Sequence, residues 1–210
     1  MTAHALPNLG YVKRLLTPEQ LLPVWQEIRE IQNSPQEQES WSHNLVGNIK
    51  REYRLKKSEQ HLESIAIELC SEYAKNYSYP QNLEQVEGAH RLALTWTWAN
   101  FMTAGEYNPA HGHNGVMSFV LWLQVPYLLA DEDREWPTVT EDKRSVARFA
   151  LHYTDSIGVI NTHFVPVDRC YEGVMIMFPS QMRHSVYPFY TSKEDRISVA
   201  GNLLFKPISG

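Results

Sequence analysis

From about residue 90 onward the apolar residues recur at every second position, and this period is the feature that most constrains the fold. In the segment His90–Met102, Trp96 and Trp98 lie on one face of an extended chain, whereas Thr95 and Thr97 lie on the other. Turn-forming residues separate further runs of this kind, which we predict as strands at Val116–Val125, Ala147–Tyr153, Asn161–Val167, Gly173–Phe178, His184–Pro188 and Arg196–Phe205. Many short strands in succession predict an all-β core.

The first 90 residues have a helical period instead. Thr17 is placed to cap a helix, with Pro18 in its first turn and Gln20 closing a capping box. A second helix is predicted over residues 58–77, and the polar residues 33–57 read as a long connection with one short element. The stretch 130–145 has no periodicity and is expected to be a long loop. We therefore expect one domain, residues 1–210, with a helical layer over about 1–89 packed on a β core over about 90–210.

Composition limits the classes of partner and the cellular location that we expect. The formal net charge of −5 and the pI of about 6.0 give no basic surface of the kind that nucleic acid requires, so no nucleic-acid partner is expected. Cys70 and Cys170 lie far apart and are expected to be unpaired thiols. The N-terminus lacks a leader pattern and no apolar run is long enough to cross a membrane, so we expect a cytoplasmic protein, in the host cytoplasm if it is viral.

The stretch 105–113, which reads GEYNPAHGH, carries the strongest chemical signal. His111 and His113 are two residues apart on an extended segment, so both imidazoles point to the same side. A metal that prefers imidazole needs a further ligand from another strand, and His184 follows the apolar run 173–180. His152 and His163 are isolated histidines in strand-like surroundings, and we expect structural roles for them.

A second pair of polar residues, Arg196 and Ser198, follows His184 on one strand face. With these residues the chain resembles the 2-oxoglutarate/Fe(II)-dependent oxygenases, and particularly the short oxygenases of phages and marine bacteria, whose site reads like NPPHTHP and later FPS…H. The resemblance covers about residues 90–205. It implies a double-stranded β-helix (jelly roll) and a dioxygenase that uses Fe(II) and 2-oxoglutarate. The implied reaction is hydroxylation of a substrate, with decarboxylation of 2-oxoglutarate to succinate.

The resemblance also implies roles for single residues. Gly105, Tyr107 and His111 match the family's G…Y…HxD segment, which supplies the first two iron ligands, and His184 matches the distal histidine. His113 stands where aspartate is usual. A site with His113 as ligand holds three neutral imidazoles, which offset none of the metal charge and also suit zinc.

In the other interpretation a carboxylate such as Glu106, or a water, takes the place of His113. For the co-substrate, Arg196 and Ser198 match the pair that holds the far carboxylate of 2-oxoglutarate, since a guanidinium can meet a carboxylate bidentately. By analogy with family members that carry an asparagine on the preceding strand, Asn100 is expected to hydrogen-bond the co-substrate.

Two other classes of function stay open. Cupins share the jelly roll and a glycine placed before HxH, although the glutamate that cupins carry a few residues later is missing here. A non-catalytic binding or structural jelly-roll protein, such as a virion component, is the third class. The primary substrate is left open by the sequence, and a peptidyl side chain, a nucleobase and a small metabolite all fit.

Overall fold

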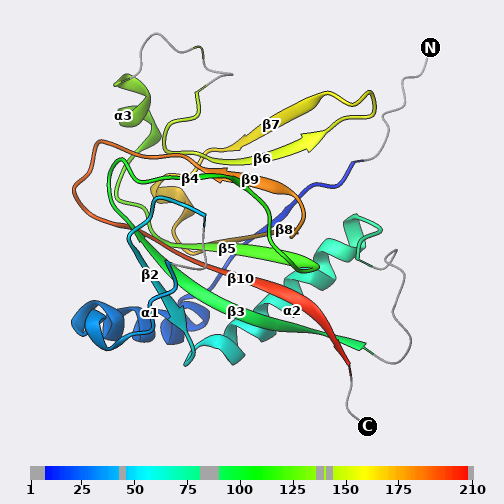
Figure 1. The fold of residues 1–210 in the computed structure, drawn as a ribbon, viewed down its shortest axis with the longest axis horizontal. Coiled ribbons are helices and arrows are strands. Elements are labelled where there is room, and N and C mark those ends of the chain that lie inside the picture. Colours follow the sequence, from blue (N-terminus) through cyan, green and yellow to red (C-terminus); the bar gives the residue numbers. More distant parts are fainter. Residues whose placement is uncertain (1–7, 43–45, 81–89, 136–139, 141–143, 208–210) are drawn as a thin grey trace.

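The structure is a computed structural model that describes residues 8–42, 46–80, 90–135, 140 and 144–207. Two antiparallel sheets form its core (Figure 1). The larger sheet has the order β1 (Val12–Leu15), β8 (Val174–Pro179), β5 (Met117–Gln124), β10 (Arg196–Pro207), β3 (His90–Met102) and β2 (Arg51–Leu55). The smaller sheet has the order β4 (Asn108–His111), β9 (Arg183–Val186), β6 (Phe149–Thr154) and β7 (Ile160–Val165). This arrangement confirms the predicted jelly roll.

The alternation of side chains explains why the larger sheet can be covered on both faces. One face packs on helices α1 (Pro18–Asn33) and α2 (Glu59–Asn76), which lie together beneath the sheet in Figure 1. Phe119 on β5 packs on the helix side. Trp122, three residues further along the same strand, points to the opposite face and packs against Phe149 of the smaller sheet. The space between the two sheets is therefore lined by alternate residues of the central strands.

Helix α1 begins as its sequence predicts. The Thr17 backbone N–H donates to Gln20 Oε1 at 3.0 Å, and the Gln20 N–H donates to Thr17 Oγ1 at 3.3 Å, which together form the capping box. Helix α2 also lies within one residue of its predicted bounds at each end. None of the helices in the described ranges is long and apolar enough to cross a membrane.

The start of α2 depends on one buried carboxylate of α1. Glu27, 6% exposed, accepts the backbone N–H groups of Lys56, Lys57 and Ser58 at 2.7–2.9 Å, and also the Ser58 hydroxyl at 2.6 Å. Burial alone would raise the pKa of Glu27, but the hydrogen bonds from Ser58 and the backbone outweigh it and hold the pKa below its ordinary value. The carboxylate thus holds the two helices together.

We expect Glu27→Ala to destabilise the protein by about 2–4 kcal/mol, because it leaves buried N–H groups at the start of α2 without an acceptor. Urea unfolding followed by circular dichroism measures this. Glu30→Ala removes a half-exposed carboxylate of the same helix that forms a surface ion pair with Lys57, and it serves as the control with a change below about 0.5 kcal/mol. Equal effects of the two variants would contradict the capping role of Glu27.

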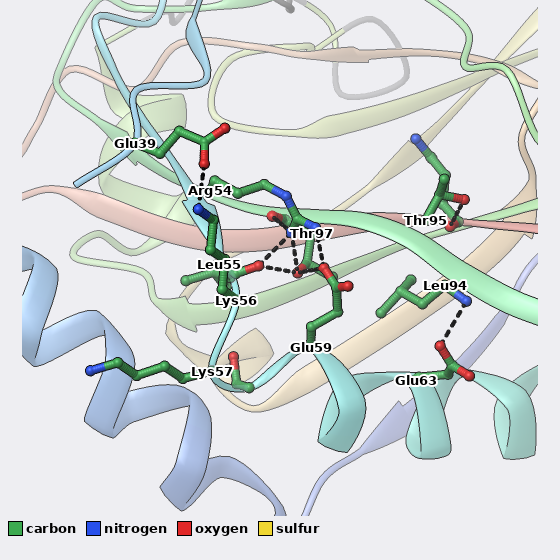
Figure 2. Close-up of polar contacts among 12 residues, drawn as sticks. Glu39, Arg54, Leu55, Lys56, Lys57, Glu59, Glu63, Leu94, Thr95 and Thr97 are labelled. Carbon is green, nitrogen blue, oxygen red and sulfur yellow. Dashed lines mark hydrogen bonds and ion pairs between the residues drawn. The ribbon is translucent and has the colours of Figure 1, made fainter.

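Polar contacts tie β2 and α2 to the outer part of β3 (Figure 2). The Arg54 guanidinium donates to the carbonyl and the hydroxyl of Thr97 at 2.7 and 3.1 Å and forms an ion pair with Glu59. One turn along α2, Glu63 accepts the N–H of Leu94 at 3.1 Å. These contacts position β3, whose other face contributes to the pocket described below.

Three features differ from the sequence predictions. Strands β1 and β2 lie in the region expected to be a helical layer. The connection 33–57 was expected to hold one short element, and it contains β2, which pairs with the edge of β3 although its sequence, REYRL, is mostly charged. Strand β4 was not predicted, since Pro109 interrupts it. The stretch expected to be a loop begins with helix α3 (Leu129–Arg134), whose buried Glu132 accepts backbone N–H groups of residues 190–191. In each case tertiary hydrogen bonds override weak local preference.

Strand β2 also carries a buried carboxyl group without a hydrogen bond. Glu52 is 1% exposed, and neither of its oxygens has a partner within the described part of the chain. Burial, with a smaller contribution from repulsion by the neighbouring Glu106 carboxylate, raises the pKa of Glu52 to about 8. The folded protein therefore holds a proton at Glu52 that the unfolded chain releases.

We expect Glu52 to lower the stability of the wild-type protein as the pH rises from about 5 to about 8. The unfolded carboxyl has a pKa of 4.5 and the folded one about 8, so between these values unfolding releases a proton, at up to about 1.4 kcal/mol of lost stability per pH unit near the middle of the range. Glu52→Gln should flatten this slope, whereas Glu68→Gln, which alters an exposed carboxylate, should preserve it. Denaturant unfolding at several pH values is the measurement, and an unchanged slope in Glu52→Gln would refute the assignment.

Candidate metal centre

The fold brings the three predicted histidines together. His111 on β4 and His184 on β9 are direct cross-strand partners, and His113 follows β4, where its N–H donates to the Ser180 carbonyl at 2.9 Å. One potential ligand nitrogen from each ring lies within 4.8 Å of the others. The ring centroids are 4.2–5.0 Å apart. Histidines that are distant in sequence thus face one point.

Backbone carbonyls orient two of the rings. His111 Nδ1 lies 2.7 Å from the Pro109 carbonyl, and His184 Nδ1 lies 3.0 Å from the Met182 carbonyl. Because a carbonyl oxygen can only accept, Nδ1 carries the proton in each neutral ring and Nε2 keeps its lone pair. This is the outer-shell arrangement that fixes the tautomer of metal-binding histidines.

Apolar surroundings keep the rings neutral. His184 is 3% exposed and packs against Phe149 and Phe178, with ring centroids 5.6 and 5.0 Å away. Burial lowers the pKa of all three histidines, to about 4 for His113, and for His113 and His184 repulsion from the neighbouring imidazoles acts in the same direction. Neutral imidazole is the form that binds a metal, so the cluster is ready to bind one at neutral pH.

The donor set of three imidazoles fits Fe(II), which accepts nitrogen ligands and here would keep positions open for other molecules. Glu106, the carboxylate considered as a replacement for His113, lies outside the cluster. Its two oxygens accept the backbone N–H groups of Lys50 and Thr103 at 3.3 and 2.9 Å, and so it braces the turn after β3. The geometry therefore favours His113 over Glu106.

The histidines line a pocket between the two sheets, which also contains aromatic residues such as Trp98, whose ring lies 5.6 Å from that of His113. The polar lining includes the predicted Asn100 and Ser198, joined by a hydrogen bond of 3.3 Å from Asn100 Nδ2 to Ser198 Oγ. Among the described residues that line this pocket, none is Asp, Glu, Lys or Arg. An anion there would depend on the metal and on groups just outside the lining.

Arg196 is one such group. Its side chain is adjacent to the pocket but does not line it, in contrast to Ser198. Arg196 is 2% exposed, and its guanidinium donates to Tyr127 Oη at 2.7 Å and to the carbonyls of Ala147 and Tyr187 at 3.1 Å each. The guanidinium also contacts Met102 Sδ at 2.7 Å. The predicted co-substrate residues are thus near one another, but only two of the three reach the pocket directly.

The structure adds polar lining residues that the sequence reasoning missed. The Ser118 hydroxyl donates to Asn202 Oδ1 at 2.7 Å and can accept a hydrogen bond from the Ser180 hydroxyl, 2.9 Å away. Asn108, which stands in the same motif as the two histidines, is 8% exposed and its Oδ1 has no hydrogen-bond partner within the described ranges. Ser118 and Asn202 could have been found from the sequence, because each is a polar residue at an inward position of an otherwise apolar strand.

Other residues singled out from the sequence lie away from the cluster. His152 hydrogen-bonds with the hydroxyls of Thr162 and Ser185 at 3.0 and 2.8 Å, and the His163 ring packs on Tyr11 at 5.5 Å. Tyr107 is 45% exposed. Cys70 and Cys170 are free thiols, as predicted.

Several solved structures share the fold. A prolyl-4-hydroxylase from Pseudomonas putida aligns with 94% of this chain and 94% of its own, at 15% identity and a TM-score of 0.56. OsALKBH1 aligns over 94% and 98%, at 12% identity and a TM-score of 0.54. The epimerase SnoN of nogalamycin biosynthesis, which is non-heme and depends on alpha-ketoglutarate, aligns over 93% and 76%, at 12% identity and 0.54. Identities this low establish a common fold alone.

No curated protein matches the chain in sequence. The family described as "Putative 2OG-Fe(II) oxygenase" matches residues 96–202, which is more than half of the 210 residues and includes all three histidines, Asn100, Arg196 and Ser198. The chain therefore belongs to the 2-oxoglutarate- and Fe(II)-dependent oxygenases, a family that uses Fe(II) as its metal and 2-oxoglutarate as its co-substrate.

Proposed function

We propose that the protein is a hydroxylase in which His111, His113 and His184 hold Fe(II), and Asn100, Ser198 and Arg196 bind 2-oxoglutarate. The observation that carries this proposal is the convergence of three neutral imidazoles, two of them oriented by backbone carbonyls, on one point of the pocket. When bound, Fe(II) supplies the redox chemistry by which one atom of O₂ enters succinate as 2-oxoglutarate loses CO₂, and the other enters a C–H bond of the primary substrate.

The protein itself contributes binding, orientation and exclusion of water. Fixed tautomers present the Nε2 lone pairs of His111 and His184 to the metal. Ser198 and Asn100 lie on adjacent strands at the same level of the sheet, where they can hydrogen-bond a carboxylate of 2-oxoglutarate. Phe149 and Phe178 cover the ring of His184 and keep that side of the site dry.

The third histidine changes the electrostatics of the site. A carboxylate ligand would offset one of the two positive charges of Fe(II), but the three neutral imidazoles leave both. Because no Asp, Glu, Lys or Arg is among the described residues that line the pocket, the full charge of the metal would be available to attract the dianionic co-substrate. We infer that His113 favours tight chelation of 2-oxoglutarate.

The proposal is tested by measuring succinate formed from 2-oxoglutarate under air, with and without candidate substrates, together with the visible absorption band expected when Fe(II) and 2-oxoglutarate are added without oxygen. Proline-containing peptides are the first substrates to test, because the Pseudomonas putida neighbour is a prolyl-4-hydroxylase. The hydroxylated peptide should gain one oxygen atom in mass. Absence of both the band and succinate would refute the proposal and favour a non-catalytic jelly-roll protein.

A further inference from the structure

Met102 stands between the pocket and the guanidinium of Arg196. Met102 on β3 and Arg196 on β10 are direct cross-strand partners, and Met102 Sδ lies 2.7 Å from Arg196 Nη2. Met102 lines the pocket, whereas Arg196 does not. Among the described groups that contact the guanidinium, Met102 alone also lines the pocket. Its thioether therefore covers the guanidinium on the side that faces the pocket.

The other sides of the guanidinium are occupied by fixed groups. The Tyr127 hydroxyl and two backbone carbonyls accept its hydrogen bonds, and the rings of Tyr127 and Phe189 lie 5.9 and 5.5 Å from its central carbon. These partners belong to the packed interior, where rearrangement is costly. A ligand in the pocket can thus reach the guanidinium only from the side of Met102.

We propose that Met102 is a displaceable floor of the pocket, which moves aside so that the far carboxylate of a bound dicarboxylic 2-oxo acid meets Arg196. This inference rests on the proposed function, because it assumes that 2-oxoglutarate enters this pocket. Methionine suits the task, since it has three rotatable side-chain bonds and its sulfur is a weak acceptor, whereas a carboxylate forms strong charge-assisted hydrogen bonds with a guanidinium.

The consequence is selection by the length and charge of the ligand. A dicarboxylic 2-oxo acid gains the contact with Arg196 when it displaces Met102. A monocarboxylic 2-oxo acid such as pyruvate can chelate the metal but has no group to exchange for the thioether, so it leaves Met102 in place. Met102 is then a specificity-determining residue for the co-substrate.

The first test observes Met102 itself. The protein is prepared with ¹³C-labelled methionine methyl groups and loaded with Zn(II), and the Met102 resonance is assigned from Met102→Leu. Adding 2-oxoglutarate should shift this resonance, whereas pyruvate should not, and the buried Met175 and Met177 on the helix-facing side serve as internal controls. A Met102 resonance that does not move when 2-oxoglutarate binds, or that pyruvate moves equally, overturns the inference.

The second test is affinity, measured by calorimetry on the same Zn(II)-loaded protein. Met102→Ala should lower the Kd for 2-oxoglutarate by about threefold or more. In the wild-type protein part of the binding free energy is used to move the Met102 side chain aside, and the variant no longer has this cost. The Kd for pyruvate should stay the same. A residue that merely lined the pocket would give the opposite sign, with weaker binding of 2-oxoglutarate, and that result overturns the inference.

If Met102→Ala does not fold, the labelled wild-type protein still decides the question. Failure of the proposed function looks different: the wild-type protein would then bind no 2-oxoglutarate at all in calorimetry. Binding of 2-oxoglutarate with an unmoved Met102 resonance would contradict the floor and leave the proposed function intact.

Discussion

His184→Ala is expected to weaken metal binding by more than about 100-fold and to abolish 2-oxoglutarate turnover. Loss of a group that only orients a ligand weakens metal binding about 10–100-fold, and loss of the ligand itself should exceed that. His184 is the deepest of the three histidines, and its removal leaves two imidazoles that cannot complete the set. Metal content after dialysis and calorimetric titration with Fe(II) under anaerobic conditions measure the effect.

His152→Ala is the matched control. His152 is on the neighbouring strand β6, where it lies opposite Arg183 of β9 and hydrogen-bonds with Ser185. Its removal therefore tests the general effect of removing a histidine from this sheet. Its metal affinity should stay within about threefold of the wild type, a difference of less than about 0.7 kcal/mol. Circular dichroism establishes that both variants are folded. If folded His184→Ala bound Fe(II) as tightly as His152→Ala, the proposed metal centre would be wrong.

Arg196→Ala is expected to raise the KM for 2-oxoglutarate by about 100-fold, because a charge-assisted contact of up to about 3 kcal/mol is lost. The affinity for Fe(II) should remain near that of the wild type, since Arg196 contacts none of the three histidines within the described structure. Steady-state succinate formation over a range of 2-oxoglutarate concentrations separates KM from kcat.

Arg196→Ala also removes several buried hydrogen bonds, so stability must be measured beside activity. Arg196→Lys keeps the charge without the planar fork and should give an intermediate KM. Arg183→Ala is the control, because Arg183 is an exposed arginine close to the metal ligands that donates to the Ala110 carbonyl. A KM for 2-oxoglutarate that is unchanged in folded Arg196→Ala, or raised equally in Arg183→Ala, would contradict a role for Arg196 in co-substrate binding.

Much of the fold could be predicted because the signals are local. The period of two in His90–Met102 located β3 to the residue, and the capping box at Thr17 located the start of α1. For residues 33–57 the sequence predicted one short element but not its type, because nothing within REYRL distinguishes an edge strand from a charged loop until its backbone pairs with β3. Helix α3 escaped for the same reason, since it is short and its buried Glu132 is held by a distant segment.

For the site, the sequence by itself identified the candidate chemical groups. Residues two apart on a strand share a face, so the sequence alone indicated that the histidines of the HxH motif point the same way, and likewise Arg196 and Ser198. It also offered the later His184 as a further ligand. The preference for His113 over Glu106 as the proposed third ligand depended on the structure. It shows the Glu106 carboxylate engaged by backbone N–H groups of two segments that are far apart in sequence.

Only the tertiary structure decided how these groups are arranged. Cross-strand register places His111 against His184 and Arg196 against Met102, and register arises from pairing between strands that are separated by tens of residues. Burial between the two sheets then lowers the pKa values of the histidines and leaves Arg196 beneath a thioether. Strand period is a property of the local sequence, whereas pairing, burial and access to a guanidinium depend on which distant residues meet.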